Sequence, residues 1–382
     1  MKVALAHDWL TNLAGAERVI IALHETYPGA PIYTSVYFDE VFPELEGADV
    51  KTSFLQKLPW LNKKHQAVPF LRTIAFERFD LSGYDVVISS SHAEAKGVLT
   101  GPETLHICYC YTPTRYYWSG YQQYLDEPGF KYLNPLIRAV MPLMVNYLRV
   151  WDRCAADRVD LFVCTSRYVA RRIKKYYRRE AEVIHPPVKT ENLRISDAIQ
   201  DYFLMVGRLI PYKRADIVVQ AFNKLGLPLK VVGTGTEMDA LVKQAGPNIE
   251  FLGRVPDKDL WDLYSRCLAF VFPQEEDFGI APLEAMAAGR PVIAYRAGGA
   301  LETVIEGKTG VFFDRQDPQS IAKAVSSFQA DGFNPEKIRA HALKFDESAF
   351  KSKMEKFVSS SWERFQQGQL GKRASGGEPP NQ

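Results

Sequence analysis

Short apolar runs, each ending in small or polar residues and followed by a helix-like pattern, recur along the whole chain. They lie at 2–7, 84–91, 105–110, 161–164, 183–188, 202–206, 229–232, 249–252 and 270–272. Strands of parallel sheets form nearly continuous apolar runs because helices cover both faces of the sheet. Their alternation with helical patterns predicts an α/β fold of two Rossmann-like, doubly wound domains.

The composition changes near residue 190, where we place the boundary between the two domains. The run at 183–188 contains a pair of prolines and is followed by polar residues, which is typical of a linker. We therefore predict an N-terminal domain over 1–190 and a C-terminal domain over 191–347. The final stretch, 368–382, is rich in Gly, Ser, Pro and charge, and we expect it to be a disordered tail.

Length and composition favour a soluble protein of two domains. At 382 residues the chain exceeds one typical core, and 46% hydrophobic with 24% charged residues is ordinary for a globular protein. The net charge of +2 does not indicate a nucleic-acid-binding protein. Five scattered cysteines without a CxxC pair fit reduced thiols in a cytoplasmic protein better than a disulfide framework.

Membrane contact, if the protein makes any, is expected to be peripheral. The N-terminal apolar run is broken by His7 and is too short for a signal peptide, and no window of about twenty apolar residues predicts a span. The Tyr- and Trp-rich stretch 116–132 fits an acceptor groove or a membrane interface, or in part a helix packed on the core. The basic helix at 167–179 fits a solvated face or a patch for anionic lipid headgroups.

The stretch from Phe270 to Glu284 combines a strand, an acidic loop and a helix N-terminus. The apolar run ends at Pro273, acids follow it, and a Gly-containing turn leads into a helix from about Ala281. Backbone N–H groups and the helix dipole favour an anion at such a position. Glu276 and Glu284 could accept hydrogen bonds from sugar and ribose hydroxyls on either side of a phosphate. The alternative is that these acids only stabilise the positive end of the helix dipole.

A basic turn follows the strand at 202–206. Gly207 and Arg208 open this turn and Lys213 closes it, so both cations could reach one diphosphate, Arg as a planar fork and Lys as a point charge. Two exposed bases on their own usually mark no site. A second glycine turn, at Gly233, follows the next strand and would let the backbone approach a ligand.

Two features of the N-terminal half lie beyond the carboxyl ends of strands, where ligands bind in open α/β sheets. The small-residue loop that contains Gly15 joins the first strand to a helix starting near Glu17. It lacks a GxGxxG motif, so an ordinary tight turn would also explain it. His92 directly follows a later strand, with Lys96 four residues further on. A lone His is commonly structural or solvated, but its place at a strand end makes His92 a site candidate.

The triplet 257–259 has the form of a metal-binding DxD motif. Because it stands directly before Leu260 and Trp261, we interpret Asp257 as a helix N-cap and Asp259 as a first-turn acid. We therefore expect no metal site there.

The segment from 270 to 302 resembles the E-x7-E signature of retaining glycosyltransferases with the GT-B architecture, specifically glycosyltransferase family 4. The match runs through Phe270–Glu284, continues over 285–294 and includes Gly298, Gly299 and Glu302. The resemblance extends over nearly the whole chain and is strongest from 200 to 310. It implies two Rossmann-like domains facing across a cleft, with the last helix, at about 348–367, crossing back to the first domain.

The resemblance implies how side chains of the C-terminal half would bind a nucleotide sugar. Gly207, Arg208 and Lys213 match the family's G-R-x4-K element, whose two cations hold the nucleotide diphosphate. Glu276 would hold the hydroxyls of the transferred sugar, and Glu284 would hold the ribose.

Backbone groups complete the implied donor site. N–H groups near Phe278, Gly279 and Ile280 would stabilise the charge on the departing β-phosphate. The backbone around Arg254 and Val255 resembles the strand edge that recognises the base.

In the N-terminal half the resemblance is weaker. The equivalent family loop faces the cleft, which makes Gly15 a candidate contact of the donor phosphate or the acceptor. Related enzymes often have His-Thr after the strand at 105–110, and the His helps to hold the sugar, whereas this chain has Tyr111 and Thr112. The Tyr111 phenol could donate a hydrogen bond, but we assign it no catalytic role. His92 remains the catalytic candidate in this half.

The implied reaction is a metal-independent, retaining sugar transfer, because two fixed cations take over the metal's role. Glu276 is not expected to be a nucleophile, since the family generally offers no well-placed one, and the leaving phosphate would guide attack on the same face. Three segments resemble bacterial mannosyltransferases that build O-antigen or exopolysaccharide on lipid carriers: 89–97, 108–113 and 275–282. This implies GDP-mannose as donor and a polyprenyl-diphosphate-linked sugar as acceptor, at the cytoplasmic face of the inner membrane.

Three alternatives stay open. The donor could be a UDP-sugar such as UDP-glucose. A sugar-nucleotide epimerase shares the architecture but would need its own acid/base residues and no acceptor surface. A catalytically silent binding protein would keep the fold and lose the cations, and the presence of Arg208 and Lys213 argues against it.

Overall fold

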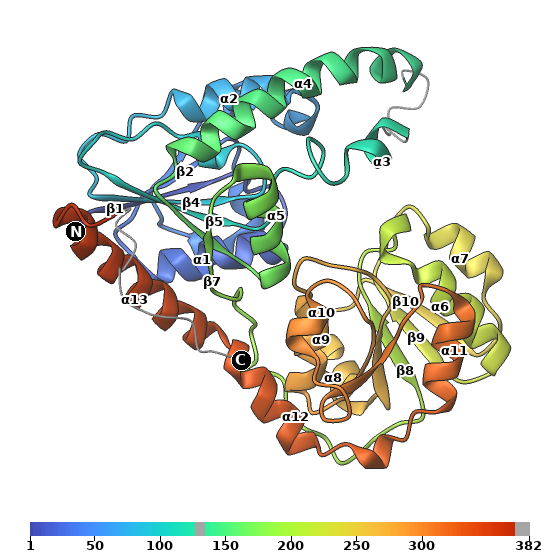
Figure 1. Ribbon diagram of the computed structural model, residues 1–382. Coiled ribbons are helices and arrows are strands. Elements are labelled where there is room, and N and C mark those ends of the chain that lie inside the picture. The colour runs from blue at the N-terminus through green and yellow to red at the C-terminus, as the bar shows by residue number, and fades with distance from the viewer. Residues whose placement is uncertain (127–133, 371–382) are drawn as a thin grey trace, which may run out of the picture. The chain divides into compact units, whose positions relative to one another are not determined.

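The computed structural model describes residues 1–126 and 134–370, and these form two compact units (Figure 1). The first unit comprises Met1–Thr165, Val169–Ile184 and Lys351–Gln382, and the second comprises Ser166–Tyr168 and His185–Phe350. The main division thus lies a few residues before the boundary expected at 190. Most of the tail expected at 368–382 lies outside the described residues.

The first unit contains a parallel sheet of seven strands among the described residues, in the order β3-β2-β1-β4-β5-β6-β7. Its strands are β1 Val3–His7, β2 Ile32–Thr34, β3 Val50–Thr52, β4 Val86–Ser91, β5 Leu105–Cys110, β6 Leu161–Cys164 and β7 Ala181–Val183. The prediction of a strand over 183–188 is wrong beyond Val183, which is the last residue of β7. Pro186 and Pro187 have no N–H to donate to a neighbouring strand, so the sheet ends before them.

Helices cover this sheet on both faces, as a parallel sheet requires. They are α1 Gly15–Thr26, α2 Pro69–Glu77, α3 Tyr121–Asp126, α4 Asn134–Arg158, α5 Arg167–Tyr177 and α13 Glu347–Gln366. Phe76 of α2 packs in a cluster with Ala4 and Val87, on one face of the sheet. On the other face the imidazole of His7 lies 4.0 Å from the carboxylate of Glu17 in α1. From Lys351 onward α13 belongs to this unit, and the Lys351 ammonium pairs with Glu25 of α1.

The second unit contains a parallel sheet of six strands among the described residues, in the order β10-β9-β8-β11-β12-β13. Its strands are β8 Phe203–Val206, β9 Leu229–Val232, β10 Ile249–Gly253, β11 Ala269–Phe272, β12 Val292–Tyr295 and β13 Gly310–Phe313. Its helices are α6 Ala215–Leu225, α7 Met238–Gln244, α8 Asp257–Arg266, α9 Ile280–Ala287, α10 Ala300–Thr303, α11 Pro318–Ser326 and α12 Pro335–Ala342.

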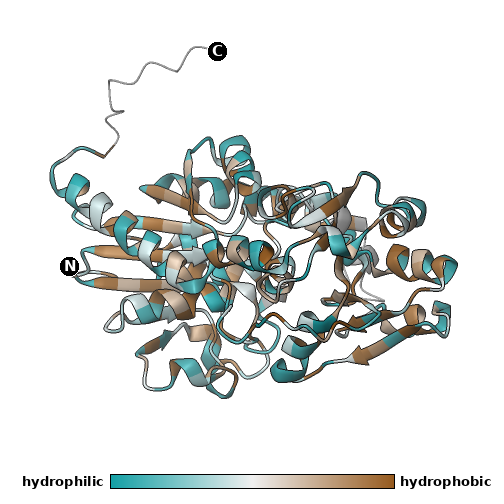
Figure 2. Ribbon diagram, turned by 90° about the horizontal axis from the view of Figure 1, so that it is seen from below, coloured by the Kyte–Doolittle hydropathy of each residue, from teal (hydrophilic) through white to brown (hydrophobic). Residues whose placement is uncertain are grey.

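Alternate residues of β11 show why the second unit has two cores. Phe270 and Phe272 pack in a cluster with residues of α8, α9 and α12, whereas Val271 packs in a second cluster with residues of α6, α7 and α11. Successive strand residues point to opposite faces, so an apolar run with no polar alternation needs helices on both sides. The strands are mostly hydrophobic and the helices are mixed (Figure 2). The prediction of two Rossmann-like α/β domains in a GT-B architecture is confirmed.

The strand order fixes where each unit can bind a ligand. In such sheets ligands bind beyond the carboxyl ends of the strands at which the strand order reverses. In the first unit these strands are β1 and β4, which pair directly, with Leu5 opposite Ile88. In the second unit they are β8 and β11, with Leu204 opposite Phe270.

Candidate functional site

An ion pair joins the loops that follow β8 and β11. Lys213 ends a short 3₁₀ helix over Pro211–Lys213, and its ammonium binds Oε1 of Glu276. Both side chains are mostly buried, with 14% of Lys213 and 20% of Glu276 exposed. Gln274 Nε2 donates to the same carboxylate oxygen over 3.3 Å. The structure thus brings together two of the residues predicted for the site.

Arg208 lies in the same turn but is exposed, and its guanidinium donates to the Tyr212 hydroxyl over 3.4 Å. The Lys213 ammonium lies 5.3 Å from the centre of the Tyr212 ring, which is the distance of a cation–π contact. Tyr212 therefore contacts both predicted cations. Nothing in the sequence pattern singled out Tyr212, because an aromatic residue in a basic turn has no function that spacing alone reveals.

Glycines let the loops after β8, β9 and β10 pack backbone against backbone. A Cβ at Gly233, whose φ is +131°, would lie 1.9 Å from the Gly207 carbonyl oxygen. Gly207 N–H donates to Val232 over 3.0 Å and Gly233 N–H donates to Gly253 over 2.7 Å. Gly233 is thus needed for loop packing, whereas a Cβ at Gly207 would meet no atom within 4 Å. Arg254 follows Gly253 as an exposed side chain. Val255, the next residue, packs against the core of the unit.

The loop between β11 and α9 is held in place by a pair of glycines after β12. Cβ atoms at Gly298 and Gly299 would lie 2.3 Å from backbone atoms of Glu276 and Phe278 respectively. The Gly299 N–H donates to the Glu276 carbonyl over 2.8 Å. No larger residue could approach so closely, so these glycines determine where the Glu276 side chain starts.

Helix α9 starts directly after this loop. Gly279 is its N-cap, with a φ of +90°, and no side chain caps the first turn, whose N–H groups begin at Ile280. The Phe278 side chain is buried and stacks on His185 with ring centroids 5.1 Å apart, so only its backbone is a candidate ligand group. Glu284 lies in the second turn, where the Tyr264 hydroxyl donates to its Oε2 over 2.9 Å.

In the first unit, Asp8 organises the loop that follows β4. Its buried carboxylate accepts hydrogen bonds from the backbone N–H groups of His92, Ala93 and Ala95. It also accepts one from the Ser91 hydroxyl. Burial alone would raise the Asp8 pKa, but the imidazoles of His92 and His7 and these N–H groups outweigh it, and the pKa is lowered. Sequence reasoning missed Asp8 because its partners lie far away along the chain.

His92 is the partly exposed member of this cluster, with 27% of its side chain accessible. Its Nδ1 lies 3.2 Å from Oδ2 of Asp8, and the rings of Trp9 and Tyr111 flank it at centroid distances of 4.7 and 6.0 Å. An Nδ1–H bonded to a carboxylate leaves Nε2 as the basic nitrogen. Burial lowers the pKa of His92, although Asp8 opposes the shift, so the ring is neutral at pH 7.

Tyr111 does not occupy the place of a free ligand group. Its hydroxyl donates to the Ala16 carbonyl over 2.8 Å and lies 2.6 Å from the Ser90 hydroxyl. Burial raises the pKa of the Tyr111 phenol well above its usual value, so it stays protonated. Tyr111 therefore holds the start of α1, where Gly15 is the first helical residue.

Lys96, which supported the interpretation of His92 from sequence, has a structural position. It is fully buried, its ammonium lies 2.6 Å from Oδ1 of Asp152, and it donates to the Thr114 hydroxyl over 3.2 Å. Lys96 therefore gives His92 no support as a site residue. Spacing along the chain does not show on which side of the loop the Lys96 amine lies.

The acidic triplet 257–259 lies at the start of α8. Asp257 and Asp259 are first-turn residues, but the N-cap is Pro256, one residue earlier than expected. Over residues 1–126 and 134–370, no group of three or more His, Cys, Asp or Glu side chains could hold a metal ion. Within the same residues, no helix combines the length and apolarity that crossing a bilayer requires.

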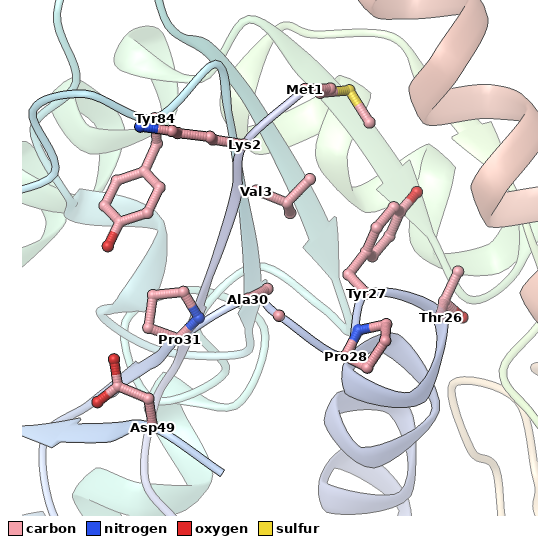
Figure 3. Close-up of a pocket in the computed structure, with 11 residues that line it drawn as sticks. Met1, Lys2, Val3, Thr26, Tyr27, Pro28, Ala30, Pro31, Asp49 and Tyr84 are labelled. Atoms are coloured by element: carbon pink, nitrogen blue, oxygen red, sulfur yellow. The ribbon is translucent and has the colours of Figure 1, made fainter.

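The cavity in Figure 3, of about 590 Å³, belongs to the first unit and lies away from the strand-end site of that unit. Met1, Lys2 and Val3 line it at the amino end of β1, together with Tyr27, Asp49 and other residues. His92 lies beyond the carboxyl end of the adjacent strand β4. None of the residues predicted for the site lines this cavity, so we assign it no ligand.

Comparisons with known proteins find similarity over the second unit and over the whole fold. Residues 191–345 match the family model described as "Glycosyl transferases group 1". The solved structure of HepE from Anabaena, in complex with UDP, has the same fold: the TM-score is 0.68 at 19% identity, over 94% of this chain and all of that one.

Two curated relatives are similar over part of the chain. An uncharacterised glycosyltransferase of Methanocaldococcus jannaschii is 29% identical over 182 residues, covering 46% of this chain and 52% of the relative. The GDP-mannose-dependent alpha-(1-6)-phosphatidylinositol monomannoside mannosyltransferase of Mycolicibacterium smegmatis is 28% identical over 220 residues, covering 49% and 58%. The chain therefore spans about half the length of the curated relatives that it matches.

Proposed function

We propose that the second unit binds a nucleotide-diphosphate sugar and that the protein is a retaining, metal-independent glycosyltransferase. The observation that carries this proposal is the pairing of Lys213 with Glu276 at the carboxyl ends of β8 and β11. A cation and a carboxylate at the start of a helix provide for both halves of the donor, its diphosphate and its sugar hydroxyls. The match to the group 1 family model over 191–345 supports the same assignment.

In the reaction, the bond between the anomeric carbon and the β-phosphate oxygen breaks, and the acceptor oxygen bonds to that carbon on the same face. The diphosphate leaves with an added negative charge, and the acceptor's proton leaves with the phosphate. Lys213, Arg208 and the first N–H groups of α9 stabilise this charge, because fixed dipoles and cations need little reorganisation. Glu276 holds the sugar hydroxyls and is not a nucleophile.

The ion pair explains how one site holds the donor's two chemical halves. An arriving diphosphate competes with Glu276 for the Lys213 ammonium. When Lys213 turns to the phosphate, the Glu276 carboxylate is released to accept hydrogen bonds from the sugar. Donor binding thus exchanges the ion pair of Lys213 with Glu276 for one with the phosphate, and the carboxylate stays hydrogen-bonded through the sugar hydroxyls.

Glu284 is proposed to hold the ribose, with the Tyr264 hydroxyl orienting its carboxylate. The backbone of Arg254 and Val255, beyond β10, is proposed to contact the base. Gly233 allows the loops after β8 and β9 to pack closely, and Gly207 opens the turn proposed to hold the diphosphate. In the first unit we assign Gly15 to the approach of a ligand phosphate or acceptor. We assign His92 to an acceptor hydroxyl through Nε2.

The proposed donor is GDP-mannose and the proposed acceptor a lipid-linked saccharide. The name of the Mycolicibacterium relative specifies GDP-mannose and a phosphatidylinositol mannoside, and a relative from Rhizobium leguminosarum bv. viciae is named a lipopolysaccharide core mannosyltransferase. A UDP-sugar is the second candidate, because HepE from Anabaena was solved with UDP and with UDP-glucose.

Thermal stabilisation by free nucleotides separates the two donors. A ligand that binds only the folded state raises the melting temperature with its concentration. We expect GDP to raise it and UDP and ADP to leave it nearly unchanged, whereas a preference for UDP would overturn the GDP-mannose assignment.

Incubation with radiolabelled GDP-mannose and a bacterial lipid extract then tests the reaction itself. Transfer of label to the lipid fraction supports the proposal. Recovery of an epimerised nucleotide sugar identifies an epimerase instead, and binding without turnover identifies a silent binding protein.

A further inference from the structure

The outer face of α4 is apolar although it is exposed. Val140, Leu143, Met144, Tyr147 and Val150 follow the three- and four-residue spacing of one helix face, and between 37% and 78% of each residue is accessible. On the opposite face Met141, Val145 and Leu148 are buried in a separate cluster. A helix that is apolar on both faces is expected to be covered on both.

One residue of α2 extends this face, and the loop that precedes α2 carries two more exposed apolar side chains. Phe70 of α2, 45% exposed, contacts Tyr147 with ring centroids 5.6 Å apart, and α2 and α4 run beside each other (Figure 1). The loop 57–64 leads towards α2 and presents Leu58 and Trp60, the latter 64% exposed. We call the eight residues Leu58, Trp60, Phe70, Val140, Leu143, Met144, Tyr147 and Val150 the α4 face. Among the described residues they are half of the exposed large hydrophobics.

The charge around the α4 face is positive. The chain has no acid from residue 50 to 76 or from 128 to 151, and within the first of these stretches Lys57, Lys63 and Lys64 are exposed. Three of the four acids that flank the stretches are paired with bases: Asp49 with Lys51, Glu77 with Arg158 and Asp152 with Lys96. The fourth, Glu127, lies outside the described residues. The Lys64 ammonium lies 5.4 Å from the centre of the Trp60 ring.

We propose that the α4 face docks the protein on a lipid bilayer that contains anionic headgroups. Apolar side chains on one helix face, an interfacial Trp and surrounding lysines without acids are the composition that binds such a surface in plane. A protein partner or a second copy of this chain would need complementary acids opposite the lysines and gives no reason for a face free of acids. A bilayer with anionic headgroups would bind both the apolar residues of the α4 face and the exposed lysines.

The basic helix α5, a candidate for lipid contact from sequence, is less suited to this role. The Arg172 guanidinium donates to Thr112, and Lys174 pairs with Glu180. Arg179, just after α5, donates to the backbone carbonyls of Ala156 and Asp160. The aromatic stretch 116–132 is also less suited. The buried Tyr117 donates its hydroxyl to Glu94, and Trp118 donates to Asp152. Phe130 and Tyr132 lie outside the described residues.

Flotation of the full chain with vesicles tests the proposal without donor or acceptor, so its failure would leave the proposed transferase activity untouched. We expect binding to phosphatidylcholine vesicles mixed with phosphatidylglycerol and much weaker binding to phosphatidylcholine alone. The substitutions Leu143→Glu and Tyr147→Glu should each lower the vesicle partition coefficient by about tenfold or more. Lys63→Glu with Lys64→Glu should remove the preference for anionic lipid, by about tenfold.

A matched control uses an exposed apolar residue of the other unit. Val242 of α7 is 48% exposed, and Val242→Glu should bind vesicles like the parent protein. Because Leu143 and Tyr147 are exposed, their variants should keep the parent melting temperature, which excludes misfolding as the cause.

A fluorescent label supplies a second readout. All five cysteines lie within the described residues, and only Cys154, one turn of α4 beyond Val150, is exposed. An environment-sensitive maleimide on Cys154 should shift to shorter wavelength with anionic vesicles, and not with Leu143→Glu. Unchanged vesicle binding by Leu143→Glu and Tyr147→Glu would overturn the proposal. Concentration-dependent dimerisation that these variants abolish, without vesicle binding, would identify a self-association interface instead.

Discussion

Each unit holds a carboxylate where the order of its strands reverses, and the two carboxylates are held in opposite ways. Asp8 is fully buried and accepts hydrogen bonds from three backbone N–H groups and a hydroxyl. Glu276 is 20% exposed and is held by the side chains of Lys213 and Gln274. Backbone donors cannot leave without rearranging the loop, whereas side chains can rotate to another rotamer. The first site is therefore fixed and the second can exchange partners.

This difference matches the roles that we propose for the two sites. A group that positions His92 gains from being fixed, because the imidazole orientation is then set before a ligand arrives. A group that must release a lysine to a phosphate and then hold a sugar gains from exchangeable partners. The contrast predicts that changes at Asp8 reduce stability first and that changes at Lys213 reduce turnover first.

Replacing Asp8 should have the largest effect. Asp8→Asn brings an NH₂ group towards several N–H donors and leaves some of them unsatisfied in a buried site. We expect the free energy of unfolding to fall by about 3 kcal/mol or more, measured by urea unfolding of the full chain. The control is Asp85→Asn, because this carboxylate is 41% exposed and lies 3.7 Å from the chain's amino terminus. This variant should change the free energy of unfolding by less than about 1 kcal/mol. Equal stability of the two variants would remove the contrast between the two sites.

Replacing Lys213 should leave the fold intact and slow the reaction. Lys213→Ala removes one of the two cations that stabilise the departing diphosphate, so we expect kcat to fall by at least about tenfold. Lys230, which lies 3.6 Å from Glu250 in the same unit, offers a matched control, and Lys230→Ala should keep the parent kcat. Turnover near that of the parent in Lys213→Ala would exclude this lysine from the mechanism.

Replacing Glu284 should act on binding more than on turnover. Glu284→Ala removes the acceptor proposed for the ribose hydroxyls, and we expect the Kd for GDP in calorimetry to rise by about tenfold. Tyr264→Phe removes only the hydroxyl that orients this carboxylate, so the rise should be smaller, about threefold. If Glu284→Ala bound GDP as tightly as the parent, the ribose assignment would be wrong.

The fold and half of the candidate site were predictable from local sequence. Uninterrupted apolar strands such as 270–272 require helices on both sheet faces, and a strand-end turn with Arg208 and Lys213 can be recognised within a few residues. What local pattern does not contain is which distant loops meet. The pairing of Lys213 with Glu276 and the capping of the loop after β4 by Asp8 both depend on strand order.

Errors came from side-chain direction. Lys96 stands four residues after His92, and spacing does not reveal that its amine turns inward to Asp152. Tyr111, to which we assigned no catalytic role, also follows a strand end, and its phenol donates to the Ala16 carbonyl inside the unit. Near a strand end, an inward and an outward side chain differ by a single rotamer or a small shift of the backbone, so sequence alone does not separate them.

The smallest predicted effect concerns the protonation of His92. Burial lowers its pKa below 6.5, so as the pH falls through 6.5 the unfolded chain binds a proton that the folded chain does not, and stability declines. Asp8, whose pKa is also lowered, stays ionised throughout this window. His92→Asn removes the titration, so its stability relative to the parent should improve between pH 7.5 and pH 5.5 by less than about 1 kcal/mol. His65, with a pKa lowered to about 4, contributes equally to both proteins. A stability difference that stays constant with pH would show that His92 titrates as freely as an exposed histidine, and the first site would then not be the fixed one.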